Sequence, residues 1–224
     1  MYKKNNFKVA IIGLGYVGLP LYLLCVQKKI DVVGYDSNSE KIIKLKNNIS
    51  YIADVKNSDL KKYKSKQLFT MDKIKNINDR NLIIFCLPTP ILKNRDPDMS
   101  YIKKALISMK DYISDKTFLI LESTVYPGAT REIFGSFIKS KLKKKVGIEY
   151  GFSSERISPG QTDRRKFKIN YKDIPKVISG SNEKTLVKIN SFYRILFKKT
   201  HKVKSIEVAE MSKLLENSYR AVNI

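Results

Sequence analysis

Short apolar runs alternate with longer amphipathic segments along this chain. The runs at 7–12, 31–35 and 82–87 are compact and rich in β-branched residues, as in strands buried on both faces of a parallel sheet. Apolar residues at helical spacing predict helices between these runs. The alternation predicts a Rossmann-like doubly wound α/β fold, in which helices cover both faces of a parallel sheet.

Other segments have a less clear apolar pattern but fit the same α/β arrangement. Residues 50–81 are polar and lysine-rich and are expected to hold a short helix, whereas the basic segment 156–172 has few large apolar side chains and predicts a loop. Further strands are expected near 68–71, 118–121, 148–153, 176–179 and 202–205. Helices are expected over 16–28, after a cap at Ser37 or Asn38, over 100–113, from Pro127-Gly128 to about 142, over 182–196, and from 205 to the last residue.

The sequence predicts two structural units, an α/β domain over residues 1–200 and the beginning of a helical one over 201–224. The last predicted helix has a mostly apolar stripe for which the remaining sequence offers no partner. The stripe is expected to pack against a second chain or against a domain outside this sequence, and it consists of Met211, Leu214, Leu215, Ser218 and Val222.

Charge raises one alternative class of function. The chain has 224 residues and a formal net charge of +23, which suggests a nucleic-acid or anionic-membrane partner. Lysine outnumbers arginine, however, and is spread along the whole length instead of clustering. We therefore expect no nucleic-acid partner, and a salt-dependent DNA or RNA binder is kept as a rival hypothesis.

The cysteines and the histidine suggest neither a disulfide framework nor a metal site. Cys25 and Cys86 lie in apolar runs, there is no CxxC pattern, and His201 is the single histidine. A reducing, cytoplasmic setting fits this composition best. The uncharged run 9–26 follows basic residues like a signal peptide or membrane span, but three glycines and a proline interrupt it, so we predict a buried strand and helix and no membrane insertion.

A glycine-rich motif gives the first indication of a binding site. Gly13, Gly15 and Gly18 form a GxGxxG that directly follows a predicted strand and opens a predicted helix. The first glycine allows the tight turn, the second lets the backbone approach a pyrophosphate, and the third lets helix and strand pack closely. The N–H groups at the helix start favour the phosphate charge. The alternative is that these glycines only shape a turn.

An acidic residue ends the next predicted strand. Asp36 is placed to accept hydrogen bonds from the adenosine ribose hydroxyls, and such charge-assisted bonds are worth roughly 1.5–3 kcal/mol. Its carboxylate would repel a 2′-phosphate, which favours NAD over NADP. The alternative role of Asp36 is to cap the following helix.

Five segments together resemble a known family. The sequence is similar to the UDP-glucose/UDP-N-acetylmannosamine dehydrogenases, and closest to the branch that oxidises UDP-N-acetylhexosamines for surface polysaccharides. The segments occur in the family's order: GLGYVGLPL (13–21), CLPTP with DPDMS (86–100), ESTVYPG (122–128), SSERISPG (153–160) and AEMSKLLENSYRAVNI (209–224).

The resemblance implies an NAD-dependent 6-dehydrogenase. In the family, the C6 alcohol of a UDP-sugar becomes a carboxylate while two NAD are reduced, and a cysteine thiolate carries the sugar as a thiohemiacetal and then a thioester. The full-length form is expected to be a homodimer with a UDP-sugar substrate. UDP-glucose 6-dehydrogenase and a non-catalytic NAD-binding remnant are the alternatives.

The resemblance also implies roles for particular residues. Tyr16, Val17, Asp36 and less strongly Lys41 would hold the dinucleotide, with Thr89 and Thr124 near the nicotinamide. Glu155 would orient the water for thioester hydrolysis, and Thr124 is counted among the catalytic residues. Arg156 and Ile157 would reach the sugar nucleotide, while Lys213, Asn217 and Arg220 would support the sugar and its oxyanion.

The spacing of the three residues on the last predicted helix independently supports their role at the sugar. Lys213, Asn217 and Arg220 are four and three residues apart, so they share one helix face. An ammonium and an amide near C6 can stabilise a developing oxyanion. The alternative is a solvated polar face. The alternative for Glu155 is that it forms an ion pair on the surface. The alternative for Thr124 is that its hydroxyl forms a hydrogen bond with the backbone at the end of a strand.

One family feature is missing. The family's catalytic cysteine lies in a GFGG-x-C segment beyond the position equivalent to Ile224, and the domain that binds UDP follows it. Cys25 and Cys86 lie in apolar runs without an evident base to activate them. The chain by itself is therefore expected to bind NAD without completing turnover.

Overall fold

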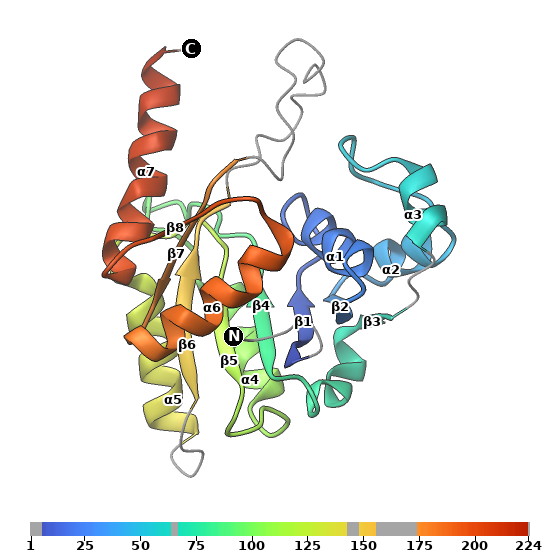
Figure 1. Ribbon diagram of the computed structural model, residues 1–224, viewed down its shortest axis with the longest axis horizontal. Coiled ribbons are helices and arrows are strands. Elements are labelled where there is room, and N and C mark those ends of the chain that lie inside the picture. The colour runs from blue at the N-terminus through green and yellow to red at the C-terminus, as the bar shows by residue number, and fades with distance from the viewer. Residues whose placement is uncertain (1–5, 64–66, 143–147, 156–173, 224) are drawn as a thin grey trace.

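Within the residues that the structure describes, eight strands form one sheet in the order β3-β2-β1-β4-β5-β6-β7-β8. The computed structural model describes residues 6–63, 67–142, 148–155 and 174–223 (Figure 1). The inner order 3-2-1-4-5-6 is that of the doubly wound dinucleotide-binding fold, which confirms the predicted fold class. The strands are β1 (Lys8–Ile12), β2 (Asp31–Asp36), β3 (Leu68–Thr70), β4 (Leu82–Phe85), β5 (Phe118–Leu121), β6 (Glu149–Ser153), β7 (Lys176–Gly180) and β8 (Thr200–Lys202).

The last two strands correct the predicted plan. β7 pairs with β6 in antiparallel orientation, and β8 is parallel to β7, so the all-parallel expectation was wrong at this edge. Apolar patterning reports burial and carries no information on strand direction. The last strand was also predicted too late, at 202–205. It ends at Lys202 because Ser205 already accepts the Val208 N–H at the start of the final helix.

Helices cover both faces of the sheet (Figure 1). α1 and α6 pack on one face, and α4, α5 and the start of α7 pack on the other. Asn38 and Asn182 cap α2 and α6 with their side chains, as polar residues at these positions should. The helical segments are α1 (Gly18–Gln27), α2 (Ser39–Lys46), α3 (Asn57–Tyr63), η2 (Met71–Ile77), α4 (Ser100–Met109), η3 (Arg131–Gly135), α5 (Ser136–Lys141), α6 (Glu183–Leu196) and α7 (Ile206–Asn223).

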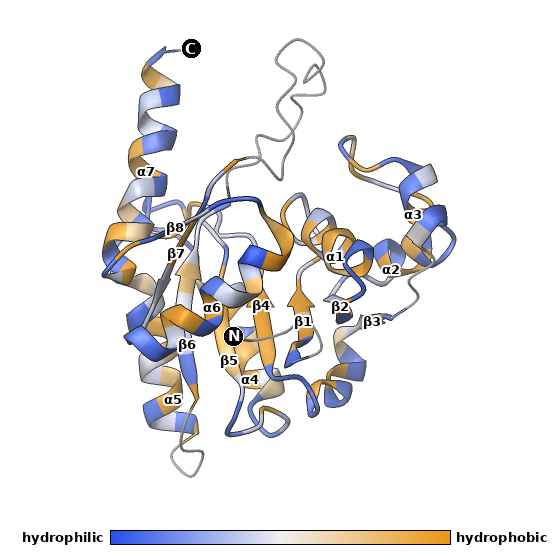
Figure 2. Ribbon diagram, in the orientation of Figure 1, coloured by the Kyte–Doolittle hydropathy of each residue, from blue (hydrophilic) through white to orange (hydrophobic). Residues whose placement is uncertain are grey.

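The central strands are buried on both sides. Every residue of β4 and β5 is buried, and the hydropathy colouring shows them as an apolar centre flanked by more polar helix surfaces (Figure 2). Burying one large aliphatic side chain contributes about 1.5–3 kcal/mol. This two-sided core fixes the strand positions, and therefore the edge at which their carboxyl ends meet.

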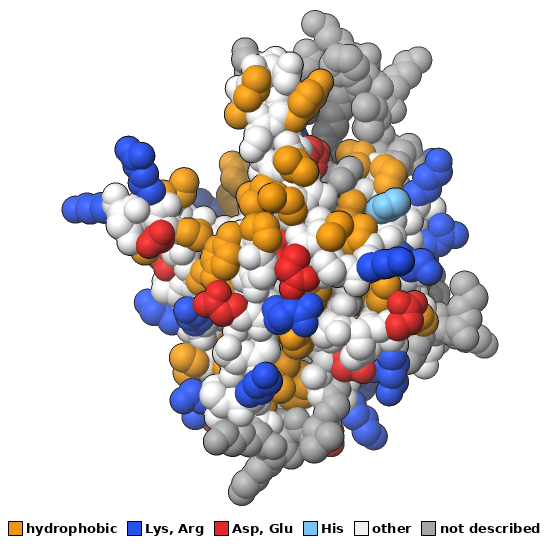
Figure 3. Space-filling view, turned by 90° about the vertical axis from the view of Figure 1, so that its left-hand side faces the viewer, with side chains coloured by type: hydrophobic (Ala, Val, Ile, Leu, Met, Phe, Trp, Pro, Cys, Tyr) orange, Lys and Arg blue, Asp and Glu red, His pale blue; other side chains and the backbone are white. Residues whose placement is uncertain are grey.

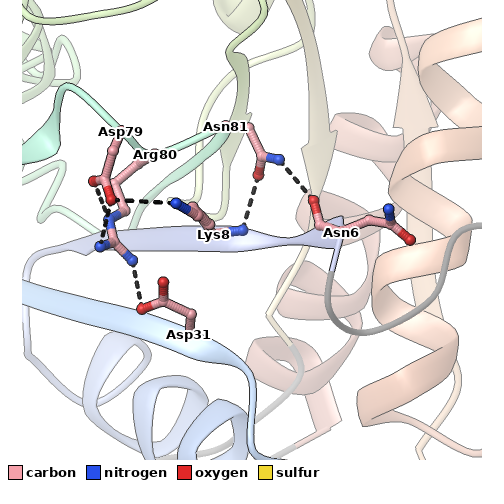
Figure 4. Close-up of polar contacts among 6 residues, drawn as sticks. All are labelled: Asn6, Lys8, Asp31, Asp79, Arg80 and Asn81. Carbon is pink, nitrogen blue, oxygen red and sulfur yellow. Dashed lines mark hydrogen bonds and ion pairs between the residues drawn. The ribbon is translucent and has the colours of Figure 1, made fainter.

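A cluster of polar residues joins strands at the edge of the sheet where β1, β2 and β4 begin, opposite the carboxyl ends of the strands (Figure 4). The guanidinium of Arg80 contacts Asp31 at 2.6 Å and Asp79 at 2.8 Å. The side chain of Asn81 accepts the Lys8 N–H at 2.9 Å and donates to the Asn6 carbonyl at 2.6 Å. These contacts join the starts of β1, β2 and β4 and leave the carboxyl ends available for a site.

α7 is anchored at its start and projects at its end (Figure 1). The Glu210 carboxylate is buried and accepts the backbone N–H groups of Gly128 at 2.6 Å and Thr130 at 2.9 Å. On another part of α7, Met211, Leu215 and Val222 of the predicted stripe are exposed, together with Val208 and Tyr219. Figure 3 shows apolar side chains along the face of α7 that is turned toward the viewer.

Candidate dinucleotide site

The glycine-rich turn between β1 and α1 has the geometry that its sequence predicts. Gly13 has a φ of +92°, and a Cβ there would lie 2.5 Å from the Cys86 carbonyl oxygen. A Cβ on Gly18 would lie 1.8 Å from the Gly13 carbonyl oxygen, so helix and turn approach too closely for any side chain. Gly15, by contrast, faces open space, with no atom within 4 Å of its built Cβ. The turn therefore leaves an open cradle where a pyrophosphate can approach the backbone.

Asp36 lies beside this turn at the end of β2. It is 7% exposed, and its two carboxylate oxygens accept the N–H groups of Leu14 and Asn38, each at 2.9 Å. The Lys41 ammonium lies 3.6 Å from the same carboxylate. Each carboxylate oxygen can accept two hydrogen bonds, so Asp36 is both fixed in place and still able to bind ribose hydroxyls.

Tyr51 is a further contact that the sequence did not indicate. Its hydroxyl donates to the Leu14 carbonyl at 2.6 Å, and Lys41 lies 5.5 Å from its ring centroid. Burial, and secondarily the charge of Asp36, raises the pKa of the Tyr51 hydroxyl, which keeps it a donor. The peptide groups around Leu14 are thus held from two sides, by Asp36 and by Tyr51.

A cavity of about 770 Å³ opens at the carboxyl ends of the strands. It lies where the strand order reverses, between β1 and β4, as ligand sites in doubly wound sheets do. Gly18, the first residue of α1, does not line the cavity. The other predicted cofactor residues all line the cavity: Gly13, Gly15, Tyr16, Val17, Asp36, Lys41, Thr89 and Thr124.

Two hydrogen bonds join the loops that follow β4 and β5. The Thr89 hydroxyl donates to the Thr124 carbonyl at 2.7 Å, and the Ser123 hydroxyl donates to the Leu87 carbonyl at 2.6 Å. The Thr124 side chain itself is exposed at the cavity. The end of the cavity far from Asp36 is therefore preformed by these two loops.

A buried charge cluster, made of Glu122, Glu155, Lys176 and Tyr193, adjoins this far end. The Lys176 ammonium lies 2.8 Å from Glu122 and 3.4 Å from Glu155, and the Tyr193 hydroxyl donates to Glu122. Glu155 was predicted as a site residue, and it lines the cavity together with Glu122. No role was predicted for Glu122, which follows β5 and opens the ESTVYPG segment, or for Lys176 and Tyr193, which come from β7 and α6 and lie in none of the five segments.

Burial shifts the ionisation of this charge cluster. Desolvation raises the pKa of Glu122, and the attraction of Lys176 offsets this only in part. Burial alone would lower the pKa of Lys176, but Glu122 and Glu155 together raise it above its ordinary value. Desolvation and hydrogen bonding to Glu122 likewise raise the pKa of Tyr193. Lys176 therefore stays a cation between the two carboxyl groups.

Neither cysteine has the surroundings of an activated nucleophile. Cys86 lines the cavity but is buried, and burial together with the nearby Glu122 raises the pKa of its thiol well above the ordinary value. Burial also raises the pKa of Cys25, which is in the apolar core. A thiolate is the reactive form of cysteine, so both environments oppose nucleophilic attack.

The predicted substrate residues on α7 lie apart from the cavity wall. Lys213 is buried, Asn217 is exposed and Arg220 is half-buried. Glu216 connects them, since Lys213 lies 3.9 Å and Arg220 3.3 Å from its carboxylate, and Arg220 also donates to Asn217 at 3.3 Å. Arg156 and Ile157 lie outside the described residues.

The fold and the cavity define a dinucleotide-binding domain. Residues 7–197 match the UDP-glucose/GDP-mannose dehydrogenase family, NAD binding domain, and the chain belongs to this family. The family predicted from the sequence motifs is thereby confirmed, and so is NAD as the cofactor of this domain.

Curated relatives agree with the match. UDP-N-acetyl-D-glucosamine 6-dehydrogenase of Pseudomonas aeruginosa is 38% identical over 223 residues, which are 98% of this chain and 51% of that protein. UDP-N-acetyl-D-mannosamine dehydrogenase of Pyrococcus horikoshii is 32% identical over 221 residues, which are 97% of this chain and 51% of that protein. The chain thus spans about half the length of the curated relatives it matches.

Solved structures share the fold. The UDP-D-ManNAc dehydrogenase of Pyrococcus horikoshii has a TM-score of 0.83 and 30% identity, covering 96% of this chain and 51% of the other. The GDP-mannose dehydrogenase of Pseudomonas aeruginosa has a TM-score of 0.84 and 25% identity, with 96% and 50% coverage. Among the described residues, no helix is long and apolar enough to cross a membrane, and no group of potential metal ligands gathers.

Proposed function

We propose that this chain is the NAD-binding part of a UDP-N-acetylhexosamine 6-dehydrogenase that makes a uronic acid for surface polysaccharides. The observation that carries the proposal is the single cavity that joins the open glycine turn, Asp36 and Glu155. The branch assignment is supported by relatives that are named UDP-N-acetyl-D-glucosamine and UDP-N-acetyl-D-mannosamine dehydrogenases.

Different residues along the cavity would bind different parts of the dinucleotide. Gly15 and the α1 start would hold the pyrophosphate, and Asp36 would hold the adenosine ribose with Lys41 beside it. Bound NAD supplies the hydride acceptor. Thr89 and Thr124 would contact the nicotinamide end of the cavity.

The substrate side of the reaction would depend on two further groups of residues. Glu155 would orient the water that releases the carboxylate, while Lys213 and Asn217 would stabilise the oxyanion. Arg156, Ile157 and Arg220 would hold the sugar nucleotide. The buried state of Lys213 supports this role, because an ammonium in a dry site interacts strongly with a developing negative charge.

We further propose a two-unit organisation, with residues 1–200 as the α/β domain and 201–224 as the start of a helical domain. The exposed apolar face of α7 supports a homodimer, since contiguous apolar surface of this kind commonly marks an interface. A cytoplasmic location fits the buried thiols of Cys25 and Cys86 and a nucleotide-sugar substrate. We propose no nucleic-acid partner.

Calorimetry with NAD tests the cofactor assignment on the 224-residue chain itself. We expect saturable binding of NAD and weaker binding of NADP, because Asp36 opposes a 2′-phosphate. Absence of heat for folded protein would refute the proposal. Robust NADH production from UDP-N-acetylglucosamine or UDP-glucose by this chain alone would contradict the expected lack of turnover. Comparing the two sugars as substrates of the full-length form would decide the branch.

A further inference from the structure

The peptide groups of the glycine-rich turn are held by hydrogen bonds on both sides of Leu14. The N–H of Leu14 donates to Asp36 at 2.9 Å. The carbonyl of the next residue, Gly15, accepts the Leu19 N–H at 3.0 Å at the start of α1. Between these two bonds lies the peptide group that joins Leu14 to Gly15, and the Tyr51 hydroxyl donates to its carbonyl oxygen at 2.6 Å. Tyr51 therefore holds the middle peptide group of the turn.

The orientation of this middle peptide group depends on the Tyr51 hydroxyl. Leu14 is fixed on one side of it, because its side chain is fully buried and a Cβ on Gly34 would lie 3.0 Å from its Cδ2. Gly15 on the other side restricts the backbone little, because a residue without a Cβ adopts a wide range of angles and the space beside it is open. The hydrogen bond from Tyr51 is thus the contact that selects one orientation.

The segment between α2 and α3 that carries Tyr51 is itself well anchored. The side chains of Ile52 and Val55 are buried in the same core cluster as α1, and Tyr51 packs against that cluster. The Ser50 N–H donates to the Asn57 side chain at 2.7 Å, which closes the segment on itself. These contacts bring the Tyr51 hydroxyl to the turn from outside the glycine motif.

We propose that Tyr51 is a positioning residue for the dinucleotide phosphates, because its hydroxyl holds the Leu14 carbonyl away from the cavity and so aims the Gly15 N–H into it. In a planar trans peptide group the C=O and the N–H point in opposite directions. Gly15 lines the cavity and Tyr51 does not, so the N–H is on the ligand side. The reverse orientation would turn a carbonyl oxygen toward the phosphates, where an N–H binds them and a carbonyl repels them. The inference rests on the proposed placement of the pyrophosphate at this turn.

Tyr51 has a second contact, which a conservative substitution leaves intact. The Lys41 ammonium lies 5.5 Å from the centroid of its ring and 3.6 Å from the Asp36 carboxylate. The ring therefore supports Lys41 at the adenosine end through a cation–π contact. Tyr51→Phe keeps the ring and removes only the hydroxyl, so its effect should be confined to the turn and to the phosphates bound there.

Calorimetry on the 224-residue chain tests the inference with NAD, ADP and adenosine. Tyr51→Phe should raise the dissociation constants for NAD and ADP roughly three- to tenfold, which is the range of one ordinary hydrogen bond. Adenosine has no phosphate, and its affinity, measured by competition with NAD, should be the same in parent and variant. Tyr126→Phe is a matched control, because it removes a hydrogen bond of the same length, 2.6 Å to Glu132, from a residue that does not line the cavity. It should change none of the three constants.

The Gly15 amide gives a second readout, which a change in stability alone would not produce. In nuclear magnetic resonance spectra of the isotope-labelled parent chain, ADP should shift the Gly15 amide signal strongly and adenosine should shift it much less. In Tyr51→Phe the signal should move before any ligand is added, and its response to ADP should be smaller. The measurement on the parent chain does not depend on how well the variant folds.

The pattern of results separates the possible failures. A folded parent chain that binds neither NAD nor ADP would refute the proposed function and the inference with it. Binding of NAD without a response of the Gly15 amide to ADP would overturn the inference alone, and so would an unchanged affinity for NAD in folded Tyr51→Phe. An equal loss of affinity for ADP and adenosine would show a general distortion of the site and would also overturn it.

Discussion

Replacing Asp36 by asparagine separates binding from folding at the adenosine end. The substitution keeps the size of the side chain and one oxygen acceptor, so one of the two 2.9 Å bonds to Leu14 and Asn38 can persist. It removes the negative charge and one acceptor. The variant should therefore remain folded and lose the charge-assisted part of ribose binding.

The magnitude follows from the bonds that change. A hydrogen bond to a charged group is worth roughly 1.5–3 kcal/mol, which corresponds to a rise in the dissociation constant for NAD of about 10- to 150-fold. NADP should respond in the opposite direction relative to NAD, because the carboxylate that repels its 2′-phosphate is gone. The loss of one bond to the turn should lower the free energy of unfolding by about 1 kcal/mol.

Calorimetry with NAD and NADP, combined with urea unfolding, measures both effects. Asp111→Asn is a suitable control because Asp111 is exposed, beyond the end of α4. If the variant is folded and its affinity for NAD equals that of the parent, Asp36 does not bind the ribose. If the affinities for NAD and NADP fall equally, its effect is structural and the charge argument fails.

Three further substitutions test the turn, the charge cluster and the ion pair between Arg131 of η3 and Glu207 of α7, whose charged atoms lie 2.7 Å apart. Gly18→Ala should abolish detectable NAD binding by calorimetry and lower the melting temperature, because its Cβ would lie 1.8 Å from the Gly13 carbonyl oxygen. Lys176→Met should cost about 3–5 kcal/mol in urea unfolding, since it leaves two buried carboxyl groups without their cation; a cost below 1 kcal/mol would contradict this. Arg131 lowers the pKa of Glu207 to about 2, so this pair should stabilise the fold above pH 4.5 and lose its effect as the pH falls toward 2. Because the pair is partly exposed, the effect should be below about 1 kcal/mol, and Glu207→Gln should abolish this part of the pH dependence.

Local patterns were the part of the molecule that the sequence could predict. The runs that became β1 and β4 are continuous apolar segments, and the glycine turn needs three residues within six positions. Each of these features depends on neighbours in the chain, so composition and spacing suffice. For the same reason Asp36 could be placed beside the turn before the structure was known.

Contacts between distant elements could not be predicted in this way. Lys176 meets Glu122 across 54 positions, and Tyr193 meets it across 71. In the sequence, Lys176 looks like the polar start of a short strand, and only the register of β7 beside β6 turns it toward the carboxyl groups. Tyr51 is a similar case, because it reaches the turn across 37 positions from a polar segment without a motif.

The contacts of Glu210 that anchor α7 connect the cofactor cavity with the predicted substrate residues. The loop after β5 carries Thr124 at the cavity and, a few residues later, the N–H groups of Gly128 and Thr130 that bind Glu210. Glu210 is one turn of helix before Lys213, so the predicted oxyanion residue and the end of the cavity proposed for the nicotinamide share one support. Because Glu210 is fully buried, a shift of α7 would leave its carboxyl group without hydrogen-bond donors in an apolar setting. The start of α7 is therefore positioned by the loop that follows β5.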